Sequence, residues 1–226
     1  MRYTTTLLTA AAAMLFAASA GAGTPVSREF VPANRRPAAS GTPVSEELLP
    51  PPLPESEGTT PFALALFPSV EAPNENWDVV LLRINLFAGR HRSLWGLDVG
   101  LLGNDIAGDS SGVSVAGIWN RTGSSTGLVQ CAGFVNDCES DFTGLQAAAL
   151  ANVSKGETTG LQVALMNRAA TLSGLQVGLV NVAETGSGVQ IGLWNRTETF
   201  EGLQIGLCNV IYESTVPFFP VVNFAF

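Results

Sequence analysis

Hydrophobic and polar residues alternate in a short phrase that recurs through the second half of the chain. In the last copy, GLQIGLCN, Leu203, Ile205 and Leu207 share one face, and Gln204, Gly206 and Cys208 share the other. Such a period of two is typical of a β-strand with one apolar face and one small or polar face. Eight related phrases open with Gly96, Gly112, Gly127, Gly144, Gly160, Gly174, Gly188 and Gly202, and close with Asn104, Asn120, Asn136, Asn152, Asn167, Asn181, Asn195 and Asn209.

These repeats predict an all-β repeat protein, for which two architectures are open. In the first, each phrase is one strand of an antiparallel meander closed as a small outer-membrane-type β-barrel. A strand such as Gly202 to Val210 is close to the length that crosses a bilayer, with leucine and isoleucine toward lipid. In the second, each repeat is one coil of a β-solenoid of 14–17-residue coils with an aromatic C-terminal cap, and the asparagines form a ladder at one corner.

Two observations weigh these architectures against each other. The equivalence of all repeats favours the solenoid, because alternate strands of a barrel meet different surroundings. Against the solenoid, the half-coil after each asparagine offers only Ala169, Ala183 and Thr197, which are too small to cover three large side chains per coil. A barrel needs no such cover, because lipid supplies it. We therefore expect the barrel and keep the solenoid as the alternative.

The C-terminal segment, 212–226, predicts an aromatic strand. Phe226, with Phe224 and Val222 at alternate positions before it, resembles the recognition signal that ends bacterial outer-membrane barrel proteins, although Pro217 and Pro220 weaken a strand interior. Units such as GLQIGLCN followed by VPFFPVVNFAF also resemble a bacterial surface-repeat family with GLQIGLxN repeats and an FFPxxNFxF end. This resemblance covers about residues 94–226. It implies a surface or envelope location and no particular reaction.

The chain before the repeats indicates export and one β domain. Arg2, an apolar run over 7–18 and small residues after it predict a signal peptide over 1–22. Residues 23–60 read as a proline-rich disordered linker, and 61–226 as a single β domain. Within that domain, 61–93 supply the first strands and 94–211 the eight repeats. We expect an exported protein of the outer membrane or cell surface, with a periplasmic location less favoured.

Composition narrows the classes of partner. The formal net charge is −8 and Lys155 is the only lysine, which argues against nucleic acid, because phosphate contacts need clustered cations. The mean hydropathy of +0.27 is high for a chain without a second apolar stretch of spanning length. Its apolar side chains must therefore lie in sheets, around a core or against lipid. Outer-membrane lipid is the expected partner, and the nature of any protein or glycan partner stays open.

The candidate chemistry is sparse. His91, the only histidine, lies in a basic segment with Arg90 and Arg92 that reads as a solvated turn. Cys131, Cys138 and Cys208 read as small core residues and not as a redox or metal set. We therefore assign no catalytic, cofactor-binding or metal-binding residue and no cofactor.

Several polar residues leave weaker alternatives. The acidic link formed by Asp137, Glu139 and Asp141 could hold Ca²⁺, but a solvated turn is favoured. A shallow carboxylate site at Asp98 or Asp105 is the one enzymatic alternative. The repeat also places glycosylation sequons at Asn120, Asn152 and Asn195. It places arginines at Arg121, Arg168 and Arg196. These arginines could bind anions or pair with Glu184 or Glu198.

Together these patterns predict a non-enzymatic cell-envelope protein. The favoured form is an outer-membrane barrel with a structural or narrow-pore role. The alternative is a surface-displayed β-solenoid that serves as a binding or adhesion module.

Overall fold

The computed structural model describes residues 55–67, 70–125 and 129–225, all of which belong to one compact unit, Pro51–Phe226. The expected signal peptide, most of the expected linker and Phe226 lie outside the described residues. The first strand begins at Gly58, inside the segment expected to be linker. The described part of the chain contains no helix long and apolar enough to span a membrane.

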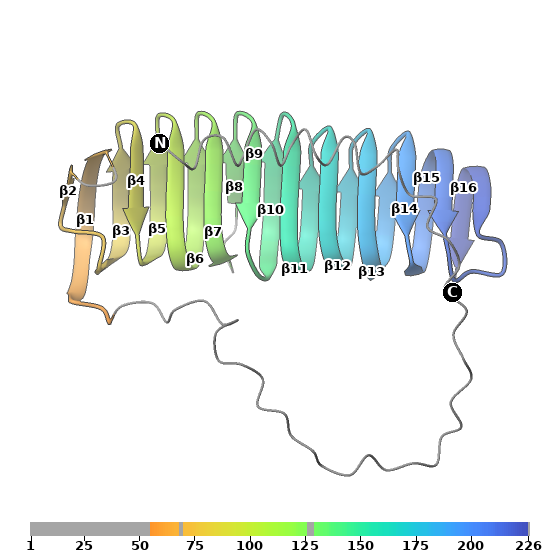
Figure 1. Ribbon diagram of the computed structural model, residues 1–226, viewed down its shortest axis with the longest axis horizontal. Helices are drawn as coiled ribbons and strands as arrows, with labels where there is room; N and C mark the ends of the chain where they lie inside the picture. The colour runs from red at the N-terminus through yellow and green to blue at the C-terminus, as the bar shows by residue number, and fades with distance from the viewer. Residues whose placement is uncertain (1–54, 68–69, 126–128, 226) are drawn as a thin grey trace, which may run out of the picture. The chain divides into compact units, whose positions relative to one another are not determined.

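Most of the described residues lie in β-strands and none in a helix, as the repeats predict. The strands are, in chain order, β1 (Gly58–Phe67), β2 (Val70–Ala72), β3 (Trp77–Asn85), β4 (Ala88–His91), β5 (Ser93–Gly100), β6 (Gly103–Ala116), β7 (Trp119–Ser125), β8 (Val129–Ala132), β9 (Val135–Cys138), β10 (Phe142–Ala148), β11 (Ala151–Val163), β12 (Met166–Val177), β13 (Val180–Ile191), β14 (Trp194–Thr197), β15 (Thr199–Ile211) and β16 (Phe218–Ala225). Figure 1 shows them stacked side by side along the long axis of the unit.

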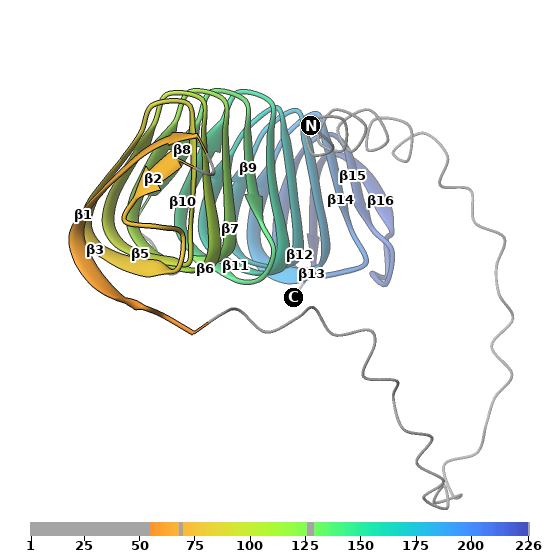
Figure 2. The same cartoon turned by 60° about the vertical axis from the view of Figure 1, so that its left-hand side comes forward.

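The strands wind as a β-solenoid, one coil per repeat (Figures 1 and 2). Each phrase bends at a corner, as at Gly178–Leu179 between β12 and β13, so it contributes to two sheets. We call these the Gln sheet and the Asn sheet after the residue each phrase places in them. Successive coils pair in parallel and in register, with Asn167 beside Asn181 and Gln176 beside Gln190.

The expected barrel is therefore wrong, and the solenoid alternative is confirmed. A meander requires antiparallel neighbours, whereas among the described pairs only the end strands β2 and β16 pair antiparallel. The first strands follow the same rule, since β1 pairs with β3 in parallel and forms a coil of the stack. The equivalence of the repeats was the correct guide, because every coil meets the same neighbours above and below it.

The interior of the stack contains a ladder of asparagine side chains. Asn181 is typical: its Nδ2 donates to Asn195 Oδ1 at 2.8 Å, and its Oδ1 accepts from Asn167 Nδ2 at 2.9 Å. The same Nδ2 also donates to the backbone carbonyl of Ile191 at 2.9 Å. The ladder runs through Asn85, Asn104, Asn120, Asn136, Asn152, Asn167, Asn181, Asn195 and Asn209.

A second ladder is built from glutamines on the Gln sheet. Gln190 Nε2 donates to Gln176 Oε1 at 2.8 Å, and Gln204 Nε2 donates to Gln190 Oε1 at the same distance. Here the later coil donates to the earlier one, whereas each asparagine donates to the coil that follows. The side-chain dipoles of the two ladders therefore oppose each other along the stack. Inside the stack, each buried amide meets its copy in the next coil and is satisfied without water, whereas Asn85 Oδ1 and Gln204 Oε1 at the ends of the ladders lack a hydrogen-bond partner among the described residues.

These ladders explain why the argument from small residues failed. Ala169, Ala183 and Thr197 do point inward, but the large apolar residues of the phrases, such as Leu203 and Ile205, lie outside, and the phrases contribute amides to the interior. Leu207, at 66% exposure, lies outside. The corner also resets the alternation, so Cys208 is half-exposed and not on the side of Gln204.

The ends of the stack depart from the repeat. Toward the N-terminus, the glutamine column continues in register as Ser114, Asp98 and Arg83. Toward the C-terminus, Asn223 of β16 pairs with Gln204 and covers the last coil. Small buried apolar clusters lie at the two ends, formed by Ala63, Val79, Leu94 and Ile106, and by Leu172, Ala183, Phe200 and Ile211.

In the phrases whose opening glycine the structure describes, this glycine is required by the backbone. Gly188 has a φ of 122°, which L-residues with a side chain rarely adopt. A Cβ at Gly188 would also strike the carbonyl group of Gly174 in the preceding coil. Tight stacking of the coils therefore fixes glycine here.

Candidate functional site

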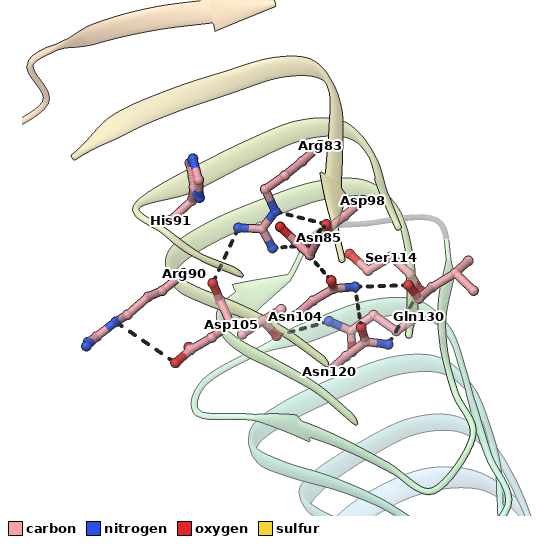
Figure 3. Close-up of polar contacts among 12 residues, drawn as sticks. Arg83, Asn85, Arg90, His91, Asp98, Asn104, Asp105, Ser114, Asn120 and Gln130 are labelled. Carbon is pink, nitrogen blue, oxygen red and sulfur yellow. Dashed lines mark hydrogen bonds and ion pairs between the residues drawn. The ribbon is translucent and has the colours of Figure 1, made fainter. Parts of the chain in front are cut away.

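The densest cluster of charged and polar side chains lies inside the N-terminal coils (Figure 3). Arg83 Nε donates to Asp98 Oδ1 at 2.9 Å, and Arg83 Nη2 pairs with Asp98 Oδ2. Both side chains are 0% exposed. Asn85 Nδ2 adds a hydrogen bond to Asp98 Oδ1 at 3.0 Å, and Arg83 Nη1 reaches the backbone carbonyl of Asp105 at 3.4 Å.

Asn85 and Gly89 occupy each other's usual positions in the repeat, on opposite sides of the interior. Gly89 stands where the repeat would place the ladder asparagine, because it pairs with Asn104. Asn85 stands where the repeat has a glycine or alanine, since it pairs with Gly100. From the opposite sheet, Asn85 Nδ2 donates to Asn104 Oδ1 at 2.7 Å and supplies the first rung of the ladder.

His91 also lies in this end of the stack, and its expected place in a solvated turn is wrong. It ends strand β4, pairs with the inward-facing Ile106 and is 1% exposed. Its Nδ1 lies 3.1 Å from Glu71 Oε2 of the capping strand β2. The segment is a strand because it stacks on β6, and this stacking turns His91 inward and Arg90 outward.

This cluster closes the end of the stack and presents no reactive group to solvent. Asp98 cannot serve as a shallow carboxylate, because it is fully buried and bound to Arg83. The enzymatic alternative at Asp98 is therefore removed. The pairing instead satisfies two charges that would be very costly to bury alone.

The outer surface of the Asn sheet is charged over its first coils. Arg90, Asp105, Arg121 and Asp137 follow one another in register, with alternating sign. Burial raises the pKa of the Asp105 carboxyl, and the nearby charge of Arg90, 3.9 Å away, opposes that rise. Asp105 thus belongs to a column of charges that alternate in sign.

The acidic link is held by ion pairs. Glu139 pairs with Arg121 at 2.9 Å and with Lys155. Burial acts to raise the pKa of Glu139, but the hydrogen bonds and charges of Lys155 and Arg121 together lower it. Asp141 Oδ1 accepts the backbone N–H of Glu157 at 2.8 Å. No group of three potential metal ligands is found among the described residues. The link therefore orders a turn by pairing its charges.

The other arginines of the repeat are also engaged locally. Arg168 lies 3.8 Å from Glu184, one of the two partners expected for this set. Arg196 lies over the ring of Tyr212, 5.1 Å from its centroid. The sequon asparagines, Asn120, Asn152 and Asn195, are 0% exposed in the ladder, so the folded protein does not offer them for modification.

The cysteines are free thiols in different surroundings. Cys138 is a buried core residue, as expected, and burial raises the pKa of its thiol. Cys131 and Cys208 are half-exposed, on the outer surfaces of the Gln sheet and Asn sheet respectively. The expectation that all three are core residues is therefore wrong for these two.

The most extensive surface feature is the outside of the Gln sheet. Two outward columns run in register from β1 to β16 and contain only apolar residues; we call them the aliphatic face. The first column is Phe62, Leu82, Leu97, Val113, Val129, Leu145, Leu161, Leu175, Val189, Leu203 and Phe224, and the second is Leu64, Ile84, Val99, Val115, Cys131, Ala147, Val163, Val177, Ile191, Ile205 and Val222.

A third apolar column borders the aliphatic face at the corner. It comprises Leu102, Ile118, Phe134, Leu150, Leu165, Leu179, Leu193 and Leu207, most of them well exposed. About ten coils at roughly 4.8 Å each, by about 15 Å across, give a surface of roughly 700 Å². Monomeric soluble proteins rarely expose an apolar patch of this size without a use for it. The aliphatic face is therefore the candidate functional site.

Sequence reasoning missed the full extent of this face and of the polar cluster. It placed Leu203, Ile205 and Leu207 together but did not extend the columns back to Phe62 or Ile84. The signal was present in residues 82–85, which read LRIN and align with LQIG of the repeat. This alignment would have placed Arg83 in the glutamine column.

No protein-family model matches this chain, and no similar curated protein or solved structure was found.

Proposed function

We propose that this chain is a non-enzymatic, surface-displayed β-solenoid of the bacterial cell envelope that acts as a binding module through its aliphatic face. The observation that carries the proposal is the inverted distribution of side chains. Amides fill the interior, whereas leucine, isoleucine and valine cover one whole outer sheet. Exposing this surface to water is unfavourable by about 25 cal/mol per Å² until a partner covers it.

Export and envelope location are supported by the sequence: the basic and apolar start of the chain, and the resemblance of the repeats to a surface-repeat family. A non-enzymatic role is supported by the described polar clusters. The largest of them is a sealed ion pair, and the others are surface charges paired with neighbours. Outer-membrane lipid and protein remain the two proposed classes of partner.

The test is site-specific cross-linking of the exported full chain in the cells that make it. A photo-reactive residue replaces Val177 on the aliphatic face, and the same residue replaces Val182 as the control. Both valines are half-buried and point outward, Val177 from the Gln sheet and Val182 from the Asn sheet. We expect a mature N-terminus at Gly21 or Gly23 and adducts from position 177 alone. An uncleaved chain beginning at Met1 would overturn the export, and equal adducts from both positions would overturn the binding face.

A further inference from the structure

The aliphatic face has the properties of a surface that pairs with itself. We infer that its partner is a second copy of this chain, bound face to face through the two Gln sheets. This inference rests on the proposed binding role and names the partner of that same surface. Three properties lead to it: the charge of the surface, its spacing and its relief.

The charge pattern disfavours a lipid surface. The two columns of the aliphatic face contain no charged residue, so they offer no pairing for an anionic headgroup. The exposed charged residues near the start of the Gln strands include Asp109, Glu157 and Glu201, which are all acidic. The whole chain carries a formal net charge of −8. Attachment to anionic lipid requires basic clusters, which this edge does not supply.

The spacing of the rows favours an identical partner. Side chains in each column repeat at the inter-strand distance of about 4.8 Å, which is set by the backbone hydrogen bonds. A second copy presents the same spacing, so its rows can fit between these rows along the whole stack. A two-fold axis makes such an interface self-complementary. An unrelated globular surface has no reason to repeat at this distance.

The relief of the face also fits a two-fold arrangement. Near the middle of the stack, the second column carries its smallest side chains, Cys131 and Ala147. In the same region the corner column carries Phe134, which is 48% exposed. In a two-fold pair, these small side chains leave room for a large side chain such as Phe134 of the other copy.

The area is sufficient for a stable dimer. A surface of roughly 700 Å² per copy is close to the ~800 Å² that each partner contributes to an interface of standard size. The outer Asn sheet offers a less apolar surface, because beside its apolar column, which includes Trp119 and Trp194, a second outward column carries Arg90, Asp105, Arg121 and Asp137. Pairing by the Gln sheets leaves this charged surface in water.

The test measures association of the purified mature chain by sedimentation velocity over a range of concentrations. We expect a monomer–dimer equilibrium. Val177→Glu should raise the dissociation constant at least about 100-fold, because each dimer would then bury two unpaired carboxylates. Val182→Glu is the matched control and should change it by less than about 3-fold. Far-UV circular dichroism checks that both variants keep the β-fold.

A second readout uses the native thiols. Maleimide should label Cys131 more slowly as concentration rises, while Cys208, on the outer Asn sheet, reacts at a constant rate. A chain that stays monomeric at every concentration would overturn the inference, as would equal effects of the two substitutions. So would a monomer that floats with phosphatidylethanolamine and phosphatidylglycerol vesicles. If position 177 forms adducts with a different protein in cells, a second copy is excluded as the partner of the aliphatic face. The proposed binding function would then still hold.

Discussion

The asparagine ladder makes a quantitative prediction about stability, and Asn181→Ala tests it. In the folded protein, Asn181 Nδ2 donates to Asn195 Oδ1 at 2.8 Å, and Asn181 Oδ1 accepts from Asn167 Nδ2 at 2.9 Å. The alanine variant leaves one N–H of Asn167 and the Oδ1 of Asn195 without partners inside a dry core. The carbonyl of Ile191 loses less, because it also accepts the N–H of Gly178 at 3.0 Å.

The expected cost follows from these two orphaned groups. Leaving a buried polar group unsatisfied costs about 1–3 kcal/mol, so the variant with two such groups should lose about 2–6 kcal/mol of unfolding free energy. Urea unfolding followed by far-UV circular dichroism measures the loss as a lower midpoint. Val182→Ala, at the adjacent outward position, should cost less than about 1 kcal/mol, because its side chain is half in water.

The end of the ladder provides a graded control. Asn209 is the last rung: it accepts from Asn195 and donates to the backbone carbonyls of Gly206 and Phe219. Asn209→Ala therefore orphans one neighbouring side-chain amide and not two, and it should cost about half as much as Asn181→Ala. Equal midpoints for Asn181→Ala and Val182→Ala would refute the view that the amides hold the interior together.

Three further predictions follow from the packing and charges. Gly206→Val should lower the folded yield far more than Glu201→Lys. A Cβ at position 206 would strike the backbone carbonyl of Gly192 in the preceding coil, whereas the Glu201 side chain is exposed. The yield of soluble protein on expression measures the difference. Asp98→Ala should destabilise by about 3–5 kcal/mol by leaving Arg83 charged and unpaired, and the double variant Arg83→Met/Asp98→Leu should recover most of the loss in urea unfolding. Asp137→Asn should stabilise the fold at pH 7. Burial and the neighbouring Glu139 raise the pKa of the Asp137 carboxyl, so its ionisation opposes folding as pH rises. In urea unfolding, the gain of the variant over wild type should vanish below pH 3.8, the ordinary pKa of this group, where the carboxyl is protonated in both states.

The sequence was sufficient to predict the strands but not the side of the sheet that lies inside. A period of two shows that Leu203 and Ile205 share one face and that Gln204 lies on the other. It does not say which of these faces is buried. We assumed that a solenoid must enclose the larger apolar residues, and the small side chains Ala169 and Ala183 then made it look hollow. The interior amides satisfy each other only across coils, so one repeat read alone does not reveal the pairing.

The residues that break the repeat were the least predictable. Arg83 is the only arginine in the glutamine column and His91 is the only histidine, so no periodic signal marks their positions. Their burial follows from the stack: each occupies an inward column at the end where the ladders stop. Arg83 is neutralised because Asp98 follows it in the same column of the next coil. Such a pairing depends on a register that becomes known only when the parallel stacking is known.

The inverted side-chain distribution separates stability from recognition in this protein. Backbone pairing and the amide ladders hold the coils together and need only Gly, Gln and Asn at their places in each phrase. Outward positions such as Val177 and Val163 contribute little to that interior, yet they are aliphatic in nearly every coil. A solvated sheet surface would favour polar residues at these positions, because exposed apolar area gains nothing from water. The aliphatic columns therefore require a second explanation, and a surface of the same chemistry and spacing on another copy supplies it.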